Sequence, residues 1–344
     1  MSCYRFASTT IRVWPLVSLL LVVTSLSARD TKANDPSLTA ATIAAEADRL
    51  RGKQTEAANL KAIDKYREAA ARWRDDGKLA NTATALRNAG EILQLLANSA
   101  DAKRTYEEAL SLTKRTKDQL EAARIHNDLA YLYFLTGNND QARQHCQTAL
   151  TVARSLRERT IEAEALYLLG ESFYNSHLAK ATALQKQSLA ISRELGQPRG
   201  QALSLIALGY YYANGRQRAD AFKSCQEAFT LARSAQDLGV ETLALIATGT
   251  IKRKFGEKQE ALTAYQAAKI PAERIGDKTS QAIIIGGIGS ASLEMNDLQT
   301  ALEYVERATA LFQANGQQWG AAEGKMNLGT IYHALGRTKS TRES

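Results

Sequence analysis

The chain has 344 residues, of which 44% are hydrophobic, 23% charged and only 7% aromatic, and its formal net charge is +8 at pH 7. Only four residues are proline, and this composition is ample for a core and favours helix throughout. The basic residues are interleaved with acids, as on a solvated helix surface, which argues against a nucleic-acid-binding protein.

The first element is an apolar stretch at 13–26, preceded by two arginines. It contains Pro15 and is shorter than the roughly 20 apolar residues that a bilayer-spanning helix needs. Small residues follow it as far as Ala28, as at a signal-peptidase site. We therefore predict a cleavable signal peptide over 1–28, export to the periplasm or beyond, and a linker over 29–37. An uncleaved membrane anchor and a buried N-terminal helix are the alternatives.

The rest of the chain repeats itself. A small residue recurs every 40 positions, with one interval of 39. Two further series, mostly of alanines, recur at the same interval and are also shortened by one residue at the same place. Three registers that shift together identify a repeat of 40 residues. The small residues are Gly90, Ala130, Gly170, Gly209, Gly249, Gly289 and Gly329. The clearest alanine series is Ala62, Ala102, Ala142, Ala181, Ala221, Ala261 and Ala301.

Each repeat has the pattern of two helices, as 125–150 illustrates. Apolar residues at helical spacing run as far as Leu135, Gly137 begins a tight turn, and a second apolar stripe follows. Two helices with so short a link pack antiparallel. We expect Ala130 to face Ala142 across the pair, so that the two backbones approach closely.

No pair can bury both of its faces alone, so the pairs must stack. We count seven pairs and a closing helix over 319–335, and we predict an all-α, right-handed α-solenoid over 38–336. The tail at 337–344 is polar and is predicted to be disordered. Pro271 is expected to break or kink a second helix. The glycine-rich run 286–289 falls mid-helix in this register, which favours close packing over a phosphate-binding loop.

The spacing resembles that of the tetratricopeptide repeat, over nearly the whole array. That family places a small residue late in the first helix, followed at set intervals by an aromatic, a glycine, an alanine, a second aromatic and a second alanine. The period of 40 rather than about 34 marks a long variety. HEAT and armadillo repeats have a similar length but place glycine and alanine differently. The matching residues of one repeat are Ala130, Tyr133, Gly137, Ala142, Cys146 and Ala149, with Cys146 at the second aromatic position.

The region 61–110 is also similar to the repeat arrays of exported bacterial proteins that end in a caspase-like CHAT domain, although these 344 residues contain no such domain. The first resemblance implies a scaffold that binds a protein or peptide in a concave groove lined by the first helices. The second implies an alternative, a regulatory or sensing subunit of a caspase-like protease or signalling system encoded separately.

Outward residues of the first helices neighbour one another at spacings of three and four. In the third to fifth units they are aromatics and amides, and aromatics are the usual anchors of protein interfaces. Arg87, Arg124 and Lys254 are expected to add positive charge. Packing between units is the alternative for these rings, as expected for the interior aromatics Tyr133, Phe173, Tyr212 and Tyr332. The predicted groove residues are Asn127, Tyr131, Phe134, Tyr167, Glu171, Tyr174, Tyr210, Asn214 and Arg253.

No group of residues predicts catalysis. The four histidines form no metal-spaced cluster, and Cys146 and Cys225 have the positions of small buried hydrophobes. His126 and Cys146 belong to facing helices, but both lie on interior stripes, which favours packing over a Cys–His dyad. The lysine–asparagine clamp by which co-chaperones of the family hold a C-terminal carboxylate is missing. We therefore expect no catalytic residue, metal, cofactor or small-molecule substrate, and membrane contact only through an uncleaved N-terminal segment.

Overall fold

The computed structural model describes residues 39–342, and side chains as far as residue 336. In this range fifteen α-helices follow one another, no strand forms, and none of the helices is long and apolar enough to cross a bilayer. The predicted signal peptide and linker, 1–37, lie outside the described residues. The helices are α2 (Ala40–Arg51), α3 (Glu56–Asp75), α4 (Leu79–Leu95), α5 (Ser99–Thr116), α6 (Gln119–Leu135), α7 (Asn139–Leu156), α8 (Arg159–Phe173), α9 (Leu178–Glu194), α10 (Pro198–Asn214), α11 (Arg218–Ser234), α12 (Leu238–Lys254), α13 (Lys258–Ile275), α14 (Lys278–Glu294), α15 (Leu298–Ala314) and α16 (Gln318–Arg342).

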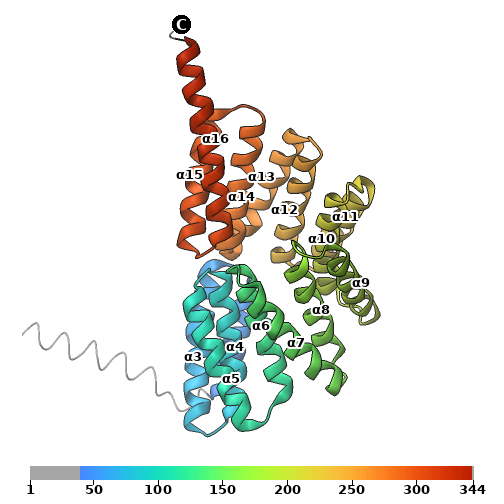
Figure 1. Cartoon of the computed structure of the whole chain (residues 1–344). Helices are drawn as coiled ribbons and strands as arrows, with labels where there is room; N and C mark the ends of the chain where they lie inside the picture. The colour runs from blue at the N-terminus through green and yellow to red at the C-terminus, as the bar shows by residue number, and fades with distance from the viewer. Residues whose placement is uncertain (1–38, 343–344) are drawn as a thin grey trace, which may run out of the picture.

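The helices pack as seven pairs, from α2–α3 to α14–α15, and α16 packs on the last of them (Figure 1). The predicted solenoid of seven pairs and one closing helix is therefore confirmed. The closing helix is longer than predicted, because α16 continues to Arg342 and takes in most of the tail at 337–344. No proline interrupts these residues, so nothing in their chemistry forces the helix to end.

Large side chains of the second helices pack against small residues on the first helices of the same pairs. A Cβ atom placed on Gly90 would lie 2.6 Å from the ring of Tyr106. The backbones also approach closely at the register where Ala130 was expected to face Ala142, since a Cβ atom on Gly170 would lie 3.3 Å from a carbonyl oxygen of α9. A larger residue at these positions would separate the helices.

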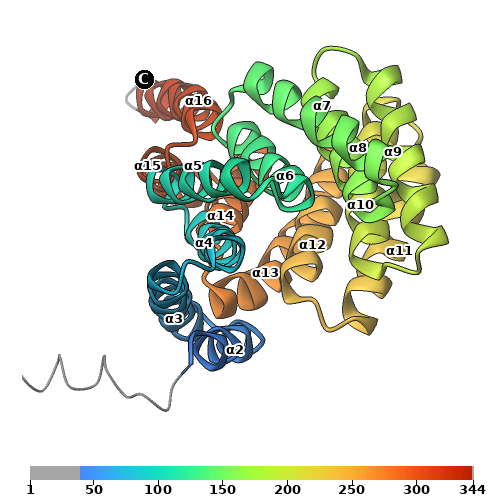
Figure 2. The same ribbon diagram turned by 90° about the horizontal axis from the view of Figure 1, so that it is seen from below.

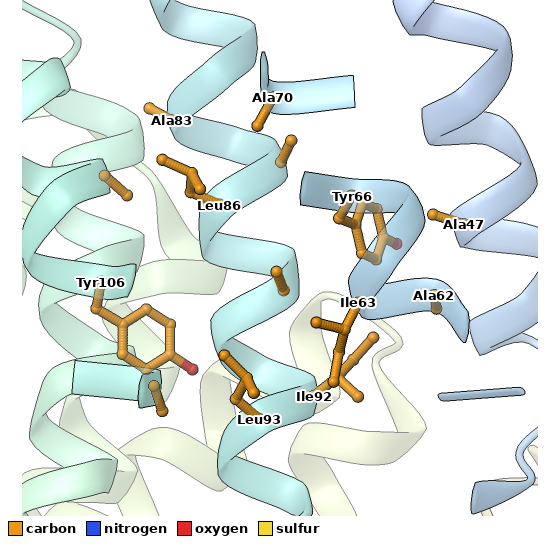
Figure 3. Close-up of a cluster of buried hydrophobic side chains, with 14 of the residues drawn as sticks. Ala47, Ala62, Ile63, Tyr66, Ala70, Ala83, Leu86, Ile92, Leu93 and Tyr106 are labelled. Atoms are coloured by element: carbon orange, nitrogen blue, oxygen red, sulfur yellow. The ribbon is translucent and has the colours of Figure 1, made fainter. Parts of the chain in front are cut away.

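The first three units share one apolar core. Tyr66 of α3 and Tyr106 of α5 are almost completely buried in it, and Figure 3 shows both rings among aliphatic side chains of neighbouring helices. Alanines such as Ala47, Ala62 and Ala83 lie where the helices come together. Each pair thus completes its core with side chains from the next pair, which is why the units must stack.

The array curves because successive first helices lie closer together than successive second helices. α6 contacts α8, α8 contacts α10, and α10 contacts α12, whereas second helices in residues 39–342 share no comparable contact. The first helices therefore line the inner, concave face, and Figure 2 shows α7, α9 and α11 outside α8 and α10. This inner face is the groove in which the predicted site residues should lie.

The array winds round until α13 contacts α3 of the first unit (Figures 1 and 2). The amide of Asn59 donates to the carbonyl of Ile275 at 3.0 Å, and Lys278 forms an ion pair with Glu56 at 2.8 Å. Gln54 hydrogen-bonds to the backbone of the link between α11 and α12. We call these the closing contacts. They make the groove an enclosed space rather than an open cradle.

Two sequence expectations concern the second half of the array. Pro271 does not break α13, which continues through it to Ile275, with the proline ring buried. The glycine-rich run lies inside α14 as predicted, and a Cβ atom on Gly287 would lie 2.5 Å from the ring of Tyr265. These glycines therefore allow close packing, and no phosphate-binding loop forms there.

The interior aromatics follow the prediction in three units and depart from it in the last. Tyr133, Phe173 and Tyr212 are half-buried and pack against the core. Tyr332 is 52% exposed, and its hydroxyl donates to Glu306 at 2.8 Å. The reason is that no second helix covers α16 in the part of the chain that the structure describes.

Candidate functional site

The predicted groove residues lie on α6, α8, α10 and α12, except that Tyr174 directly follows the end of α8, and they differ in exposure. Asn127 is buried, Asn214 is exposed, and the other seven are half-buried. The rings of Tyr131, Tyr167 and Tyr210 each pack partly against a core cluster. The aromatic band therefore contributes to packing between units and still presents part of each ring to solvent.

Asn127 joins α6 to α8. Its side chain is 4% exposed, and its Nδ2 lies 3.3 Å from the carbonyl oxygen of Ile161 and 3.3 Å from Oε2 of Glu164. Its Oδ1 has no hydrogen-bond donor among the described residues. The amide thus connects two units and leaves one buried acceptor without a partner.

Glu171 is the centre of a hydrogen-bond network inside the groove. It accepts a hydrogen bond of 2.7 Å from the hydroxyl of Tyr211 and one of 3.2 Å from Nε2 of Gln185. Burial raises the pKa of Glu171 to about 7, although both hydrogen bonds act in the opposite direction. This carboxyl group therefore titrates near neutral pH, where an ordinary glutamate is fully ionised.

The predicted residues Tyr174 and Asn214 are brought together across two units. The ring of Tyr174 stacks on that of Tyr211, with 4.9 Å between centroids and an interplanar angle of 17°. The Asn214 amide donates to the hydroxyl of Tyr174 and accepts from the ammonium of Lys254. A continuous chain of contacts thus runs from α8 through α10 to α12.

The hydroxyl of Tyr131 is influenced by a charge from a distant unit. Burial raises its pKa to about 12, and the next largest cause is the charge of Asp277, which lies at the start of α14. Burial also raises the pKa of Tyr167 and of Tyr210. The three hydroxyl groups are therefore neutral at physiological pH, and side chains from distant units influence one another across the groove. Phe134 is half-buried beside this band.

The arginines expected to make the groove positive are neutralised by acids. Nε of Arg87 lies 2.9 Å from Glu121, and the same guanidinium contacts Glu91 and Asp128. Arg253 pairs with an acid of α14. The arginines are thus paired with acids, whereas Lys254 donates to Asn214 and has no acidic partner in residues 39–336.

Sequence reasoning missed two carboxylates of the groove, Asp128 and Glu164. Each lies three residues before a predicted tyrosine, Tyr131 or Tyr167, so each shares a helix face with it. Counting back three residues from Tyr131 and from Tyr167 finds both, whereas the positions used for the prediction, three before the small residue and one, four and five after it, include neither.

Comparison with known sequences supports this geometry. Residues 121–194 match the sequence pattern of the tetratricopeptide repeat. This stretch covers α6 to α9, and the other helix pairs repeat the same packing. The chain contains tetratricopeptide repeats.

Solved structures with the same fold include several repeat proteins. The Rap conjugation gene regulator of the plasmid pLS20, in complex with the Phr* peptide, superposes with a TM-score of 0.63 at 16% identity, over 80% of this chain and 73% of that one. A Rap protein complexed with competence and sporulation factor gives 0.61 at 15% identity, over 76% and 72% of the chains. Yeast Tom70 gives 0.54 at 13% identity, over 90% and 69%. At these identities the similarity concerns the fold.

A curated relative is more similar in sequence. The 43 kDa receptor-associated protein of the synapse from Tetronarce californica is 23% identical over 203 residues, which are 57% of this chain and 49% of that protein. The chain therefore spans about half the length of this relative.

A pocket of about 280 Å³ lies in the first tetratricopeptide repeats, between α2, α3 and α4. Thr84 and Asn88 on its wall occupy the same repeat positions as Glu164 and Asp128, so the pocket continues the groove in register. Its remaining lining residues are Ala44, Asp48, Tyr66, Trp73, Ala80, Asn81 and Ala85.

Cys146, Cys225 and His126 lie in surroundings that favour packing over catalysis. Cys146 and Cys225 are buried and free, as predicted, and burial raises the pKa of each thiol to about 12. His126 does not pair with Cys146. Its Nδ1 lies 2.8 Å from Nδ1 of His145, on the facing helix α7. A thiol so resistant to ionisation is a poor nucleophile.

Proposed function

We propose that the chain is an exported scaffold that binds a protein partner by holding an extended peptide segment in the concave groove. The observation that carries this proposal is the band of half-buried rings along the inner face, at Tyr131, Tyr167, Tyr174 and Tyr210. Partly exposed aromatic rings in an enclosed groove provide apolar surface that a ligand can bury. The band extends over three successive first helices, α6, α8 and α10, which suits an extended peptide better than a compact molecule.

Two further observations support the proposal. A regulator with the same fold was solved in complex with a peptide, as its name states. The apolar stretch at 13–26, with arginines before it and small residues after it, supports export. The two buried thiols in residues 39–336 are resistant to ionisation and therefore poor nucleophiles, so binding is the function that the groove supports best.

The test is affinity capture from the exported fraction with the wild-type chain and with a Tyr131→Ala/Tyr174→Ala variant, followed by mass spectrometry. We expect the variant to keep its helical circular dichroism and to lose the partners that the wild type retains. A Leu60→Ala/Ile270→Ala variant is the matched control, because these two large apolar side chains are exposed away from the groove. Equal recovery of partners by all three chains would refute the proposal.

A further inference from the structure

Four carboxylates on or at the start of the first helices have few cationic partners, and one of them, Asp277, caps α14 by accepting hydrogen bonds from Ser280. We call them the groove carboxylates: Asp128 on α6, Glu164 and Glu171 on α8, and Asp277 at the start of α14. In residues 39–336 Glu164, Glu171 and Asp277 have no ion pair. Asp128 lies 3.5 Å from Arg87, which also serves two other acids. The groove therefore holds more carboxyl groups than its own cations pair.

The pKa values of these four carboxyl groups agree with their lack of cationic partners. Burial raises the pKa of all four groove carboxylates above the ordinary values. The repeats also contain a contrasting case, Glu257, whose pKa is lowered because Lys252 and Arg218 bind it. A carboxylate with an adequate cationic partner behaves like Glu257, and the groove carboxylates do not.

Two buried amides next to the groove carboxylates lack hydrogen-bond donors. Asn127 is 4% exposed and its Nδ2 contacts Glu164, but its Oδ1 has no donor among the described residues. Gln185 is fully buried and its Nε2 contacts Glu171, and its Oε1 also lacks a donor there. Buried acceptors of this kind are normally satisfied. The groove is therefore rich in acceptors, and what it lacks is N–H donors.

The walls of the groove are suited to a cation as well. Tyr131, Tyr167 and Tyr210 lie on three successive first helices, and the charge of Glu171 influences all three hydroxyls. The face of a tyrosine ring attracts an ammonium or guanidinium group and packs against its aliphatic stem.

The groove also differs in sign from the whole molecule. The chain has a formal net charge of +8 at pH 7, whereas its inner face presents unpaired acids. The net positive charge repels a basic ligand everywhere except at the groove, whereas an acidic ligand is attracted to the rest of the surface and not to the groove.

We propose that the groove recognises a basic peptide segment, whose lysine or arginine side chains bind the groove carboxylates while their stems pack on the three tyrosines. This inference rests on the proposed function, because it requires that the ligand occupies the groove. It adds the chemical class of the partner, a segment of protein with positive side chains.

The experiment selects peptides from a random phage-displayed library on the full chain and, in parallel, on a Glu164→Gln/Glu171→Gln variant. The matched control is Glu260→Gln/Glu303→Gln, which removes the same charge from exposed positions on the outer helices α13 and α15. We expect lysine and arginine to be enriched on the wild type and on the control, and the enrichment to disappear on the groove variant. A selected peptide, labelled with a fluorophore, should bind the groove variant about tenfold more weakly.

The outcomes separate the two proposals. If selected peptides depend on Tyr131 and Tyr174 but carry no excess of lysine or arginine, the groove binds peptides and the basic specificity is refuted. The same holds if the enrichment persists on the Glu164→Gln/Glu171→Gln variant. If no selected peptide depends on these tyrosines, the proposed function fails and the inference fails with it.

Discussion

At the scale of single residues, two adjacent glycines of α14 have opposite surroundings. A Cβ atom on Gly287 would lie 2.5 Å from the ring of Tyr265, which is 1% exposed and has no room to move. A Cβ atom on Gly286 would lie 3.4 Å from Phe312, at an ordinary contact distance. Helix propensity favours alanine over glycine by about 1 kcal/mol at both positions. Packing alone therefore decides whether each substitution raises or lowers the free energy of unfolding.

We expect Gly286→Ala to raise the free energy of unfolding by up to about 1 kcal/mol. Gly287→Ala should lower it by about 1 to 2 kcal/mol, because overpacking a core outweighs the gain in propensity. Urea unfolding followed by circular dichroism measures both. Equal effects of the two substitutions would contradict the close packing of α14 against Tyr265.

Glu171 makes stability depend on pH. Its pKa is about 7 in the folded chain, against an ordinary value of 4.5. Between these values the folded chain holds a proton that the unfolded chain has lost, so the free energy of unfolding falls as the pH rises from about 4.5 to about 7. The side chains that face this carboxyl are Tyr211 and Gln185, which do not titrate in that range.

Wild type and Glu171→Gln should therefore differ in a pH-dependent way. As the pH rises from about 4.5 to about 7, the free energy of unfolding of the wild type should fall by about 1 to 3 kcal/mol relative to that of Glu171→Gln. Below pH 4.5 the difference should be constant. Urea unfolding at several pH values measures this, and parallel stability curves for the two chains would show that Glu171 titrates as an ordinary glutamate.

At the scale of helices, most links need one residue in the left-handed region. Gly137 adopts it with φ of 82°, as the sequence predicted for a turn glycine. Ala97 adopts it with φ of 58° in the equivalent link between α4 and α5. Alanine has no turn preference, so only its place in the repeat register indicates the conformation. The glycine pattern could thus be predicted directly, and the other links only by analogy.

Ala97→Gly should raise the free energy of unfolding by about 1 kcal/mol, because glycine has no Cβ to clash in this conformation. Gly137→Ala is the reciprocal change and should lower it by about the same amount. Thermal unfolding of both variants tests the pair. A destabilised Ala97→Gly chain would mean that the link between α4 and α5 has another backbone conformation.

At the scale of the molecule, the helix pairs followed from periodicity, and the enclosure of the groove did not. The pairing could be predicted because small residues recur at a fixed interval within a short stretch. The bond between Asn59 and Ile275 joins residues 216 positions apart, and it depends on the summed rotation of all the units between them. No local sequence pattern predicts this summed rotation. The same enclosure brings Asp277 near Tyr131, which is why that carboxylate was not among the predicted groove residues.

The closing contacts carry the central claim, that the repeats wind into one enclosed groove. Lys278 and Glu56 lie 2.8 Å apart and are both partly exposed, so a carbodiimide should join them by an amide bond. The pair Lys252 and Glu257, also 2.8 Å apart, is the internal control for one helix pair. Mixing isotopically labelled and unlabelled chains identifies links within one molecule by mass spectrometry. We predict an intramolecular link between Glu56 and Lys278 that Glu56→Gln abolishes; formation of the control link without it would show that the array is open.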